Sequence, residues 1–165
     1  MTPRVSFPEE MLQRARDSVL CWLATVDDQG QPNVSPKEIY LLQPPDLLLV
    51  AHIASPTTVR NLRQNPRVCA SFVDVFVQKG WKVQGRAVLL RPGEPGFDAA
   101  HAALAALAGP AFPIHAVIAV RAEAVEPIVA PSYRLHPHTT TEASQVASAM
   151  RRYGVRAVLA PPAVG

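Results

Sequence analysis

The order of apolar and polar runs along the chain predicts short strands joined by tight turns. An almost continuous apolar run at 19–26 predicts a strand that is covered on both faces. The turn at 27–30 and the segment from Pro32 to Leu42 predict the returning strand of a hairpin. Four further strands are expected, at 47–52, 68–77, 81–90 and 115–129. The pattern therefore predicts six strands, mostly in hairpin order.

Short helices are predicted between these strands and at both ends of the chain. Ser6 and Glu9 have the spacing of a capping box, which predicts a helix that ends near Asp17. The alanine-rich segment 97–107 predicts another helix. A second capping-box spacing, at 139–142, predicts a last helix that reaches Tyr153 and is closed by Gly154.

Strands in hairpin order with helices between them indicate a mainly β fold, a closed antiparallel barrel with helices packed outside. The regular strand–helix alternation and glycine-rich first turn of a Rossmann fold are missing from the sequence. The length of 165 residues suits a single domain over 1–165. We expect the barrel core at 1–130 and a C-terminal arm and helix at 131–165.

Composition and charge narrow the class of partner. The net charge is +3, and the basic residues are scattered apart from Arg60, Arg63 and Arg67, which favours a small anionic ligand over nucleic acid. No apolar run approaches the ~20 residues of a membrane span, and the N-terminus lacks the apolar region of a secretory signal, so we expect a cytoplasmic protein. The lone Cys21 and Cys69 are interpreted as buried, inert thiols.

The segment that follows the strand at 47–52 carries the most chemical information. Ser55 is expected at the N-cap of a helix over 57–65, with Pro56 in its first turn and Pro66 after its end. Helix N-termini present unpaired amides that bind anions. The hydroxyls of Thr57 and Thr58 would add donors there, as would Arg60, with Lys37 approaching from a neighbouring strand. The alternative is an ordinary capped helix with solvated arginines.

Four segments resemble the N-terminal pattern of the pyridoxamine 5'-phosphate oxidase-like, FMN-binding split-barrel family. They are 23–27, 30–37, 60–68 and 83–87. The resemblance covers about residues 10 to 90 in matching order and spacing. It implies a six-stranded antiparallel split β-barrel and a homodimer that holds FMN at the subunit interface.

The resemblance also implies roles for individual residues. Ser35, Pro36 and Lys37 correspond to the strand beside the flavin, and Ala51 and His52 correspond to the adjoining strand end. Thr57 and Thr58 occupy the phosphate-binding positions, which are often basic in the family, so the positive charge would come from Lys37, Arg60 or the helix terminus. Gly80, Trp81 and Lys82 lie on the strand that flanks the ring, although Trp81 is equally typical of a core or interface aromatic.

The C-terminal arm supplies further candidates. Tyr133, Arg134 and His136 are candidates for the substrate side of the partner's pocket, and the alternative is an arm that only packs across the dimer. His136 and His138 lack a third ligand nearby, so no metal site is predicted. Pyridoxamine 5'-phosphate oxidase itself has a C-terminal segment with tryptophan and arginine that helps to form the substrate site. Neither tryptophan of this chain lies in its last half, so oxidation of the vitamin is not the predicted reaction.

The hypothesis from the sequence is an FMN-binding flavoprotein, an oxidoreductase that acts on a small-molecule substrate or electron donor. No catalytic residue is assigned. One alternative is a flavin carrier or sensor without catalytic activity. Another is the same fold holding deazaflavin F420 or haem. Nucleic acid and membranes are not expected partners.

Overall fold

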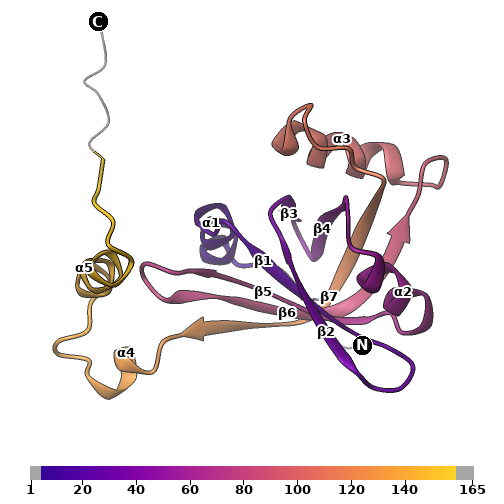
Figure 1. Cartoon of the computed structure of the whole chain (residues 1–165). Coiled ribbons are helices and arrows are strands. Elements are labelled where there is room, and N and C mark those ends of the chain that lie inside the picture. The colour runs from indigo at the N-terminus through magenta and orange to yellow at the C-terminus, as the bar shows by residue number, and fades with distance from the viewer. Residues whose placement is uncertain (1–4, 159–165) are drawn as a thin grey trace, which may run out of the picture.

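The computed structural model describes residues 5–158, which form seven strands and five helices (Figure 1). The strands are β1 Cys21–Val26, β2 Pro32–Lys37, β3 Tyr40–Gln43, β4 Leu47–His52, β5 Arg67–Asp74, β6 Lys79–Leu90 and β7 Ala116–Val129. The helices are α1 Glu9–Asp17, α2 Pro56–Gln64, α3 Phe97–Ala108, α4 Ser132–Leu135 and α5 Glu142–Tyr153. The prediction of a mainly β antiparallel barrel with flanking helices is confirmed.

All seven strands belong to one antiparallel sheet with the order β2-β1-β5-β6-β7-β4-β3. Strands β2 and β3 follow each other in the chain but lie at opposite ends of this order, so the sheet curls until its edges meet at Glu38 and Ile39. The Ala51 amide donates to the Ile39 carbonyl at 3.0 Å, which continues the pairing of β3 with β4 into this bend. The predicted single strand from Pro32 to Leu42 is therefore two strands, because the chain changes pairing partner there, and the predicted count of six becomes seven.

The first, third and fifth strands each form a hairpin with the strand that follows. Strands β6 and β7 pair along most of their length with one irregularity, at Gln84 and Gly85. A Cβ on Gly85 would lie 2.1 Å from the Arg121 carbonyl oxygen, so only glycine permits this approach of the two backbones.

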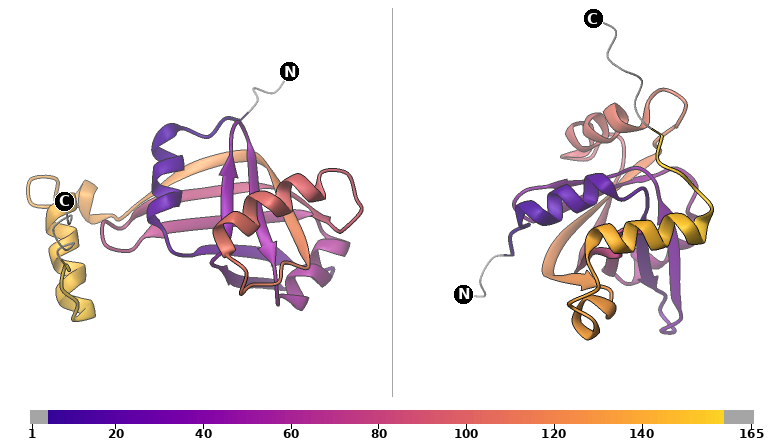
Figure 2. Two further views of the ribbon diagram at one scale, coloured as in Figure 1. Left: turned by 90° about the horizontal axis from the view of Figure 1, so that it is seen from above. Right: turned by 90° about the vertical axis from the view of Figure 1, so that its left-hand side faces the viewer.

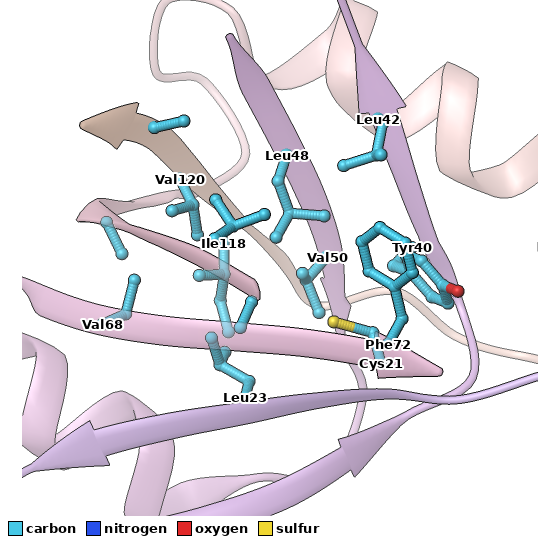
Figure 3. Packing of buried hydrophobic residues seen from close by; sticks show 14 of the residues in the cluster. Cys21, Leu23, Tyr40, Leu42, Leu48, Val50, Val68, Phe72, Ile118 and Val120 are labelled. Atoms are coloured by element: carbon cyan, nitrogen blue, oxygen red, sulfur yellow. The ribbon is translucent and has the colours of Figure 1, made fainter. Parts of the chain in front are cut away.

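The barrel interior is a continuous apolar core (Figure 3). Phe72 and Leu23 have no exposed surface, and Tyr40 stacks on Phe72 with ring centroids 6.0 Å apart. Helix α1 closes one end of the barrel with Met11, and the Tyr40 hydroxyl donates to carbonyls of Ala15 and Ser18, at 2.8 Å each. These contacts hold the helix against the sheet.

A second apolar cluster lies under α3, on the outer side of β3, β4 and β7. Leu104 and Phe97 of α3 pack there on Leu49, Ala51 and Val117. Helix α3 carries apolar residues at most positions, but only Phe97, Ala100 and Leu104 are buried.

For α1 and α5, the helix ends match the predictions better than the helix starts. Helices α1 and α5 end at Asp17 and Tyr153 as predicted, and Gly154 closes α5 with a φ of 66°. The capping box expected at Ser6 is wrong, because Pro8 is the N-cap and no side chain caps α1. The second box is present two residues later than predicted, between Thr141 and Ser144.

Helix α2 and the C-terminal helices lie at opposite ends of the molecule (Figures 1 and 2). Strand β7 ends at Val129, and the chain then leaves the barrel through α4 and α5. Within residues 5–158, no helix combines the length and the apolar character that crossing a membrane requires.

Candidate functional site

The ends of β2 and β4 meet the start of α2 at one end of the barrel. A pocket of about 190 Å³ lies there, and its lining comes from β2, from β4, from the residues that follow each of these strands up to the α2 N-cap Ser55, and from the segment before β7. The lining residues are Pro36, Lys37, Glu38, Ile39, Ala51, Ile53, Ala54, Ser55 and Phe112. The structure thus brings together residues from the two sequence segments that the resemblance singled out, 35–37 and 51–60.

Lys37 is the buried cation of this pocket. Its side chain is 5% exposed, and its Nζ donates a hydrogen bond to the Ser55 hydroxyl. Within residues 5–158 no carboxylate forms an ion pair with it. Burial lowers the pKa of Lys37 because it penalises the charged ammonium, and the neighbouring Cys21 opposes this change.

The amides in the first turn of α2 lack the side-chain cap that the sequence predicts. Ser55 is the N-cap residue, and Pro56 is in the first turn, both as predicted. The Ser55 hydroxyl, however, receives the Lys37 ammonium and does not cap the helix. The amides of Thr57 and Thr58 therefore receive no hydrogen bond from the N-cap side chain.

Thr58 differs from the expectation of a hydroxyl that points freely at a ligand. It is 1% exposed, and its Oγ1 lies 3.1 Å from the Oγ of Ser35 in a hydrogen bond. Ser35 and Thr58 thus join β2 to the first turn of α2. Thr57 is half-buried beside them, and Arg60, one turn later, is exposed.

His52 ends β4 next to this cluster. Its Nδ1 is buried and has no hydrogen-bond partner among the described residues. Burial lowers the pKa of His52, and the positive charges of Lys37 and His115 lower it further. His52 is therefore a neutral imidazole with a free polar atom, which a bound ligand could satisfy.

Gly80, Trp81 and Lys82 do not join this cluster within one chain. Lys37 pairs with Cys21, Cys21 with Phe72, and Phe72 with Trp81. Three steps between strands of about 4.8 Å each place Trp81 roughly 14 Å from Lys37 along the sheet.

The three residues have separate surroundings on β6. Trp81 is half-buried against the barrel core. Lys82 forms an ion pair with Glu126 at 2.8 Å. Gly80 is buried where a Cβ would lie 1.9 Å from the Phe72 carbonyl oxygen.

The C-terminal arm lies on the same end of the sheet as Gly80 to Lys82. The Tyr133 hydroxyl donates to the Val77 carbonyl at 2.8 Å, and the Lys79 Nζ lies 4.6 Å from the centre of the Tyr133 ring. Arg134 and His136 are exposed. The three substrate-side candidates are thus grouped together, far from α2.

Sequence reasoning missed the ion network that fixes this arm. Glu142 at the start of α5 accepts from Arg14 at 2.6 Å and from Lys79 at 3.0 Å, and Arg14 lies 3.7 Å from Asp74. The hydrogen bond from Lys79 lowers the pKa of Glu142. The partners are far apart in sequence, so no local spacing marks them.

Two further features of the structure bear on its chemistry. Residues 5–158 contain no group of three or more His, Cys, Asp or Glu placed to hold a metal ion.

A larger hollow of about 970 Å³ lies between α3 and strands β4, β6 and β7, and most of its lining is apolar. It contains none of the predicted site residues.

Comparison with known proteins assigns the family. A sequence model described as "Pyridoxamine 5'-phosphate oxidase" matches residues 7–128. The chain belongs to this family. The match includes segments 35–37 and 51–60 and the strand with Gly80, Trp81 and Lys82, but it does not include the C-terminal arm. A search of curated proteins gave no match to the chain.

Solved structures of similar fold include a protein described as a "putative pyridoxamine 5'-phosphate oxidase" and proteins whose descriptions mention FMN or F420. HupZ from Group A Streptococcus is 23% identical over 75% of this chain and 95% of its own, with a TM-score of 0.65. An FMN-binding protein from Syntrophomonas wolfei is 17% identical over 72% and 86%, with a TM-score of 0.60. A protein named F420 reductase is 25% identical over 73% and 98%, with a TM-score of 0.56.

Proposed function

We propose that the protein is an FMN-binding oxidoreductase of the pyridoxamine 5'-phosphate oxidase family that acts as a homodimer in the cytoplasm. The observation that carries this proposal is the junction of β2, β4 and α2, where the buried Lys37 ammonium lines a pocket and the uncapped amides of α2 and the unsatisfied imidazole nitrogen of His52 belong to segments that adjoin it. When bound, FMN supplies the electron or hydride chemistry, while the protein binds and orients it.

The donors at this junction fit a phosphate-bearing ligand. In the proposal, the amides of Thr57 and Thr58 and the hydroxyl of Thr57 bind the phosphate, and Arg60 adds positive charge from the surface. The Ser35–Thr58 hydrogen bond sets the distance between β2 and this turn. The Lys37 ammonium then lies toward the ring side of the ligand, where its charge stabilises an anionic reduced flavin.

The size of the pocket favours a site shared between two chains. Its volume of about 190 Å³ is below the ~300 Å³ at which pockets for drug-sized ligands begin, so one chain holds only part of such a ligand. A two-fold dimer could bring the arm end of one protomer to the α2 end of its partner. We propose that Gly80 to Lys82, Tyr133, Arg134 and His136 complete the site in this way, next to a small-molecule substrate or electron donor.

A second candidate, the deazaflavin F420, is favoured by the similarity to the protein named F420 reductase. Mass spectrometry of the ligand released by denaturing the purified protein tests both candidates, and absorbance distinguishes them from haem. Release of FMN supports the proposal. A colourless preparation that does not bind added FMN at millimolar concentration would contradict it.

Binding measurements with variants test the assignment of the phosphate turn. Lys37→Ala and Thr57→Ala should each weaken FMN binding about tenfold or more, which equals ~1.4 kcal/mol. The control is Arg91→Ala, which removes a cation from an exposed loop away from the pocket. Equal affinity in all three variants would mean that FMN binds elsewhere. Reduction of the bound flavin by NADH or NADPH in stopped flow would separate a reductase from a carrier.

A further inference from the structure

Lys37 differs from the two other lysines of the chain in what surrounds its amine. Lys79 forms an ion pair with Glu142 at 3.0 Å, and Lys82 forms one with Glu126 at 2.8 Å. The hydrogen bond to Glu126 raises the pKa of Lys82. Lys37 instead faces a hydroxyl within a pocket, and its side chain is 5% exposed. A buried lysine amine without a carboxylate partner is in the kind of environment where lysines act as nucleophiles.

Within residues 5–158, none of the groups that face Lys37 from the neighbouring elements forms an ion pair with it. Cys21 on β1 is buried, and burial raises the pKa of its thiol to about 12, so its opposing effect on Lys37 is smaller than that of burial. His52 on β4 is a weak base in this place, because burial and Lys37 itself lower its pKa. Ser55 accepts one hydrogen bond without carrying a charge. Glu38 lines the same pocket but forms no ion pair with Lys37.

The pocket next to the amine has room for a small molecule. Its volume is about 190 Å³, and its lining combines the apolar Ile39, Ala51, Ile53 and Phe112 with the polar Lys37, Glu38 and Ser55. A short-chain aliphatic molecule fits within this volume, whereas a ligand as large as FMN extends beyond it.

We propose that Lys37 is a reactive amine that condenses with short-chain aliphatic aldehydes in this pocket. The Nζ lone pair attacks the carbonyl carbon, and a C–N bond forms. The two amine hydrogens leave with the carbonyl oxygen as water, and an imine remains. The reaction needs no oxidant or reductant. The lowered pKa of Lys37 supports the reaction, because more of the amine is neutral at a given pH.

Reductive trapping of the full-length protein tests this proposal with internal controls. Flavin-free protein is incubated with propanal and sodium cyanoborohydride, which reduces the imine to a stable secondary amine, and peptide mass spectrometry assigns each adduct. At about pH 8 we expect at least tenfold more adduct at Lys37 than at Lys82, whose pKa is raised by its hydrogen bond with Glu126. Lys79 is the second comparison.

The pH profile separates pocket chemistry from general lysine reactivity. The rate at Lys37 should level off at a lower pH than the rate at Lys82, because the pKa of Lys37 is lowered and that of Lys82 is raised. Equal labelling of all three lysines by propanal, or no adduct at Lys37, would overturn the proposal without any variant that must fold.

Competition with FMN keeps this inference distinct from the proposed function. If FMN binds at the junction of β2, β4 and α2, saturating FMN should suppress the Lys37 adduct at least about tenfold. An adduct that forms equally well with bound FMN supports the reactive amine and contradicts the assigned flavin site. Protection by FMN without selective labelling of Lys37 in its absence contradicts only the reactive amine.

Discussion

The two ends of the molecule hold their polar residues in different ways. At the α2 end, Lys37 is 5% exposed and donates to one hydroxyl, that of Ser55. At the arm end, the Lys79 side chain is 26% exposed and lies between the Glu142 carboxylate, at 3.0 Å, and the Tyr133 ring, at 4.6 Å. The first end depends on single buried contacts, and the second on several partners that water reaches.

This difference has an energetic consequence. A buried charged group that loses its partner leaves a desolvated charge behind, whereas water and salt replace a partner at the surface. The α2 end should therefore be rigid and sensitive to single substitutions. The arm end should tolerate the loss of any one side chain.

The largest expected effect is at Gly80, near the arm end, where the backbones of β5 and β6 approach closely. It tests backbone packing at an end of the molecule where the loss of a side chain should be tolerated. In Gly80→Ala, the new Cβ would lie 1.9 Å from the Phe72 carbonyl oxygen, so β5 and β6 must move apart. We expect a loss of about 3 kcal/mol in the free energy of unfolding, measured by urea denaturation. Gln84→Ala, at an exposed position of the same strand, is the control. A Gly80→Ala protein as stable as this control would show that the strands do not approach so closely.

The next effect tests the buried contact at the α2 end. Ser55→Ala removes the acceptor of the Lys37 ammonium, and the loss should be about 2 kcal/mol at neutral pH. The matched control is Ser132→Ala at the arm end, where the Ser132 hydroxyl accepts from the neutral Gln145 amide at 2.6 Å. This change should cost less than about 1 kcal/mol. Equal losses in the two urea titrations would mean that the two ends are not energetically different.

The α2 end was predictable from sequence because its signals are local. A serine, a proline and two threonines after an apolar strand predict a helix start at Ser55, and the structure has that start. Lys37 could be placed beside it because the hairpin returns β2 to the same end of the barrel. The engagement of Ser55 by Lys37 and of Thr58 by Ser35 could not be predicted, because it depends on how two distant segments meet.

The bend between β2 and β3 shows where local patterns fail. No glycine or proline separates Lys37 from Tyr40, so the sequence favours one continuous strand. The chain changes edges there because β3 pairs with β4 and β2 pairs with β1, which is a property of the whole sheet. The same long-range order places Gly80 to Lys82 away from Lys37, and their role in one site thus stays a prediction about two chains.

The smallest expected effect is at the ion network of the arm. Glu142→Gln removes the acceptor of both Arg14 and Lys79, but Glu142 is 45% exposed, so the loss should be only about 0.5–1 kcal/mol. In this variant, hydrogen exchange of the α5 amides should be faster than in the wild type at low salt. At high salt the two exchange rates should differ little.

The pH dependence of the same contact has a definite sign. The pKa of Glu142 is lowered in the folded protein, mainly by the hydrogen bond from Lys79, so its contribution is present above the ordinary carboxyl pKa. It is lost as the pH falls through the lowered value, and the Glu142→Gln variant should lack this step. Glu126→Gln is the control, because it breaks an ion pair with Lys82 that does not touch α5. If α5 exchanges equally fast in both variants, Glu142 does not hold the helix, and the contrast between the two ends would rest on burial at the α2 end alone.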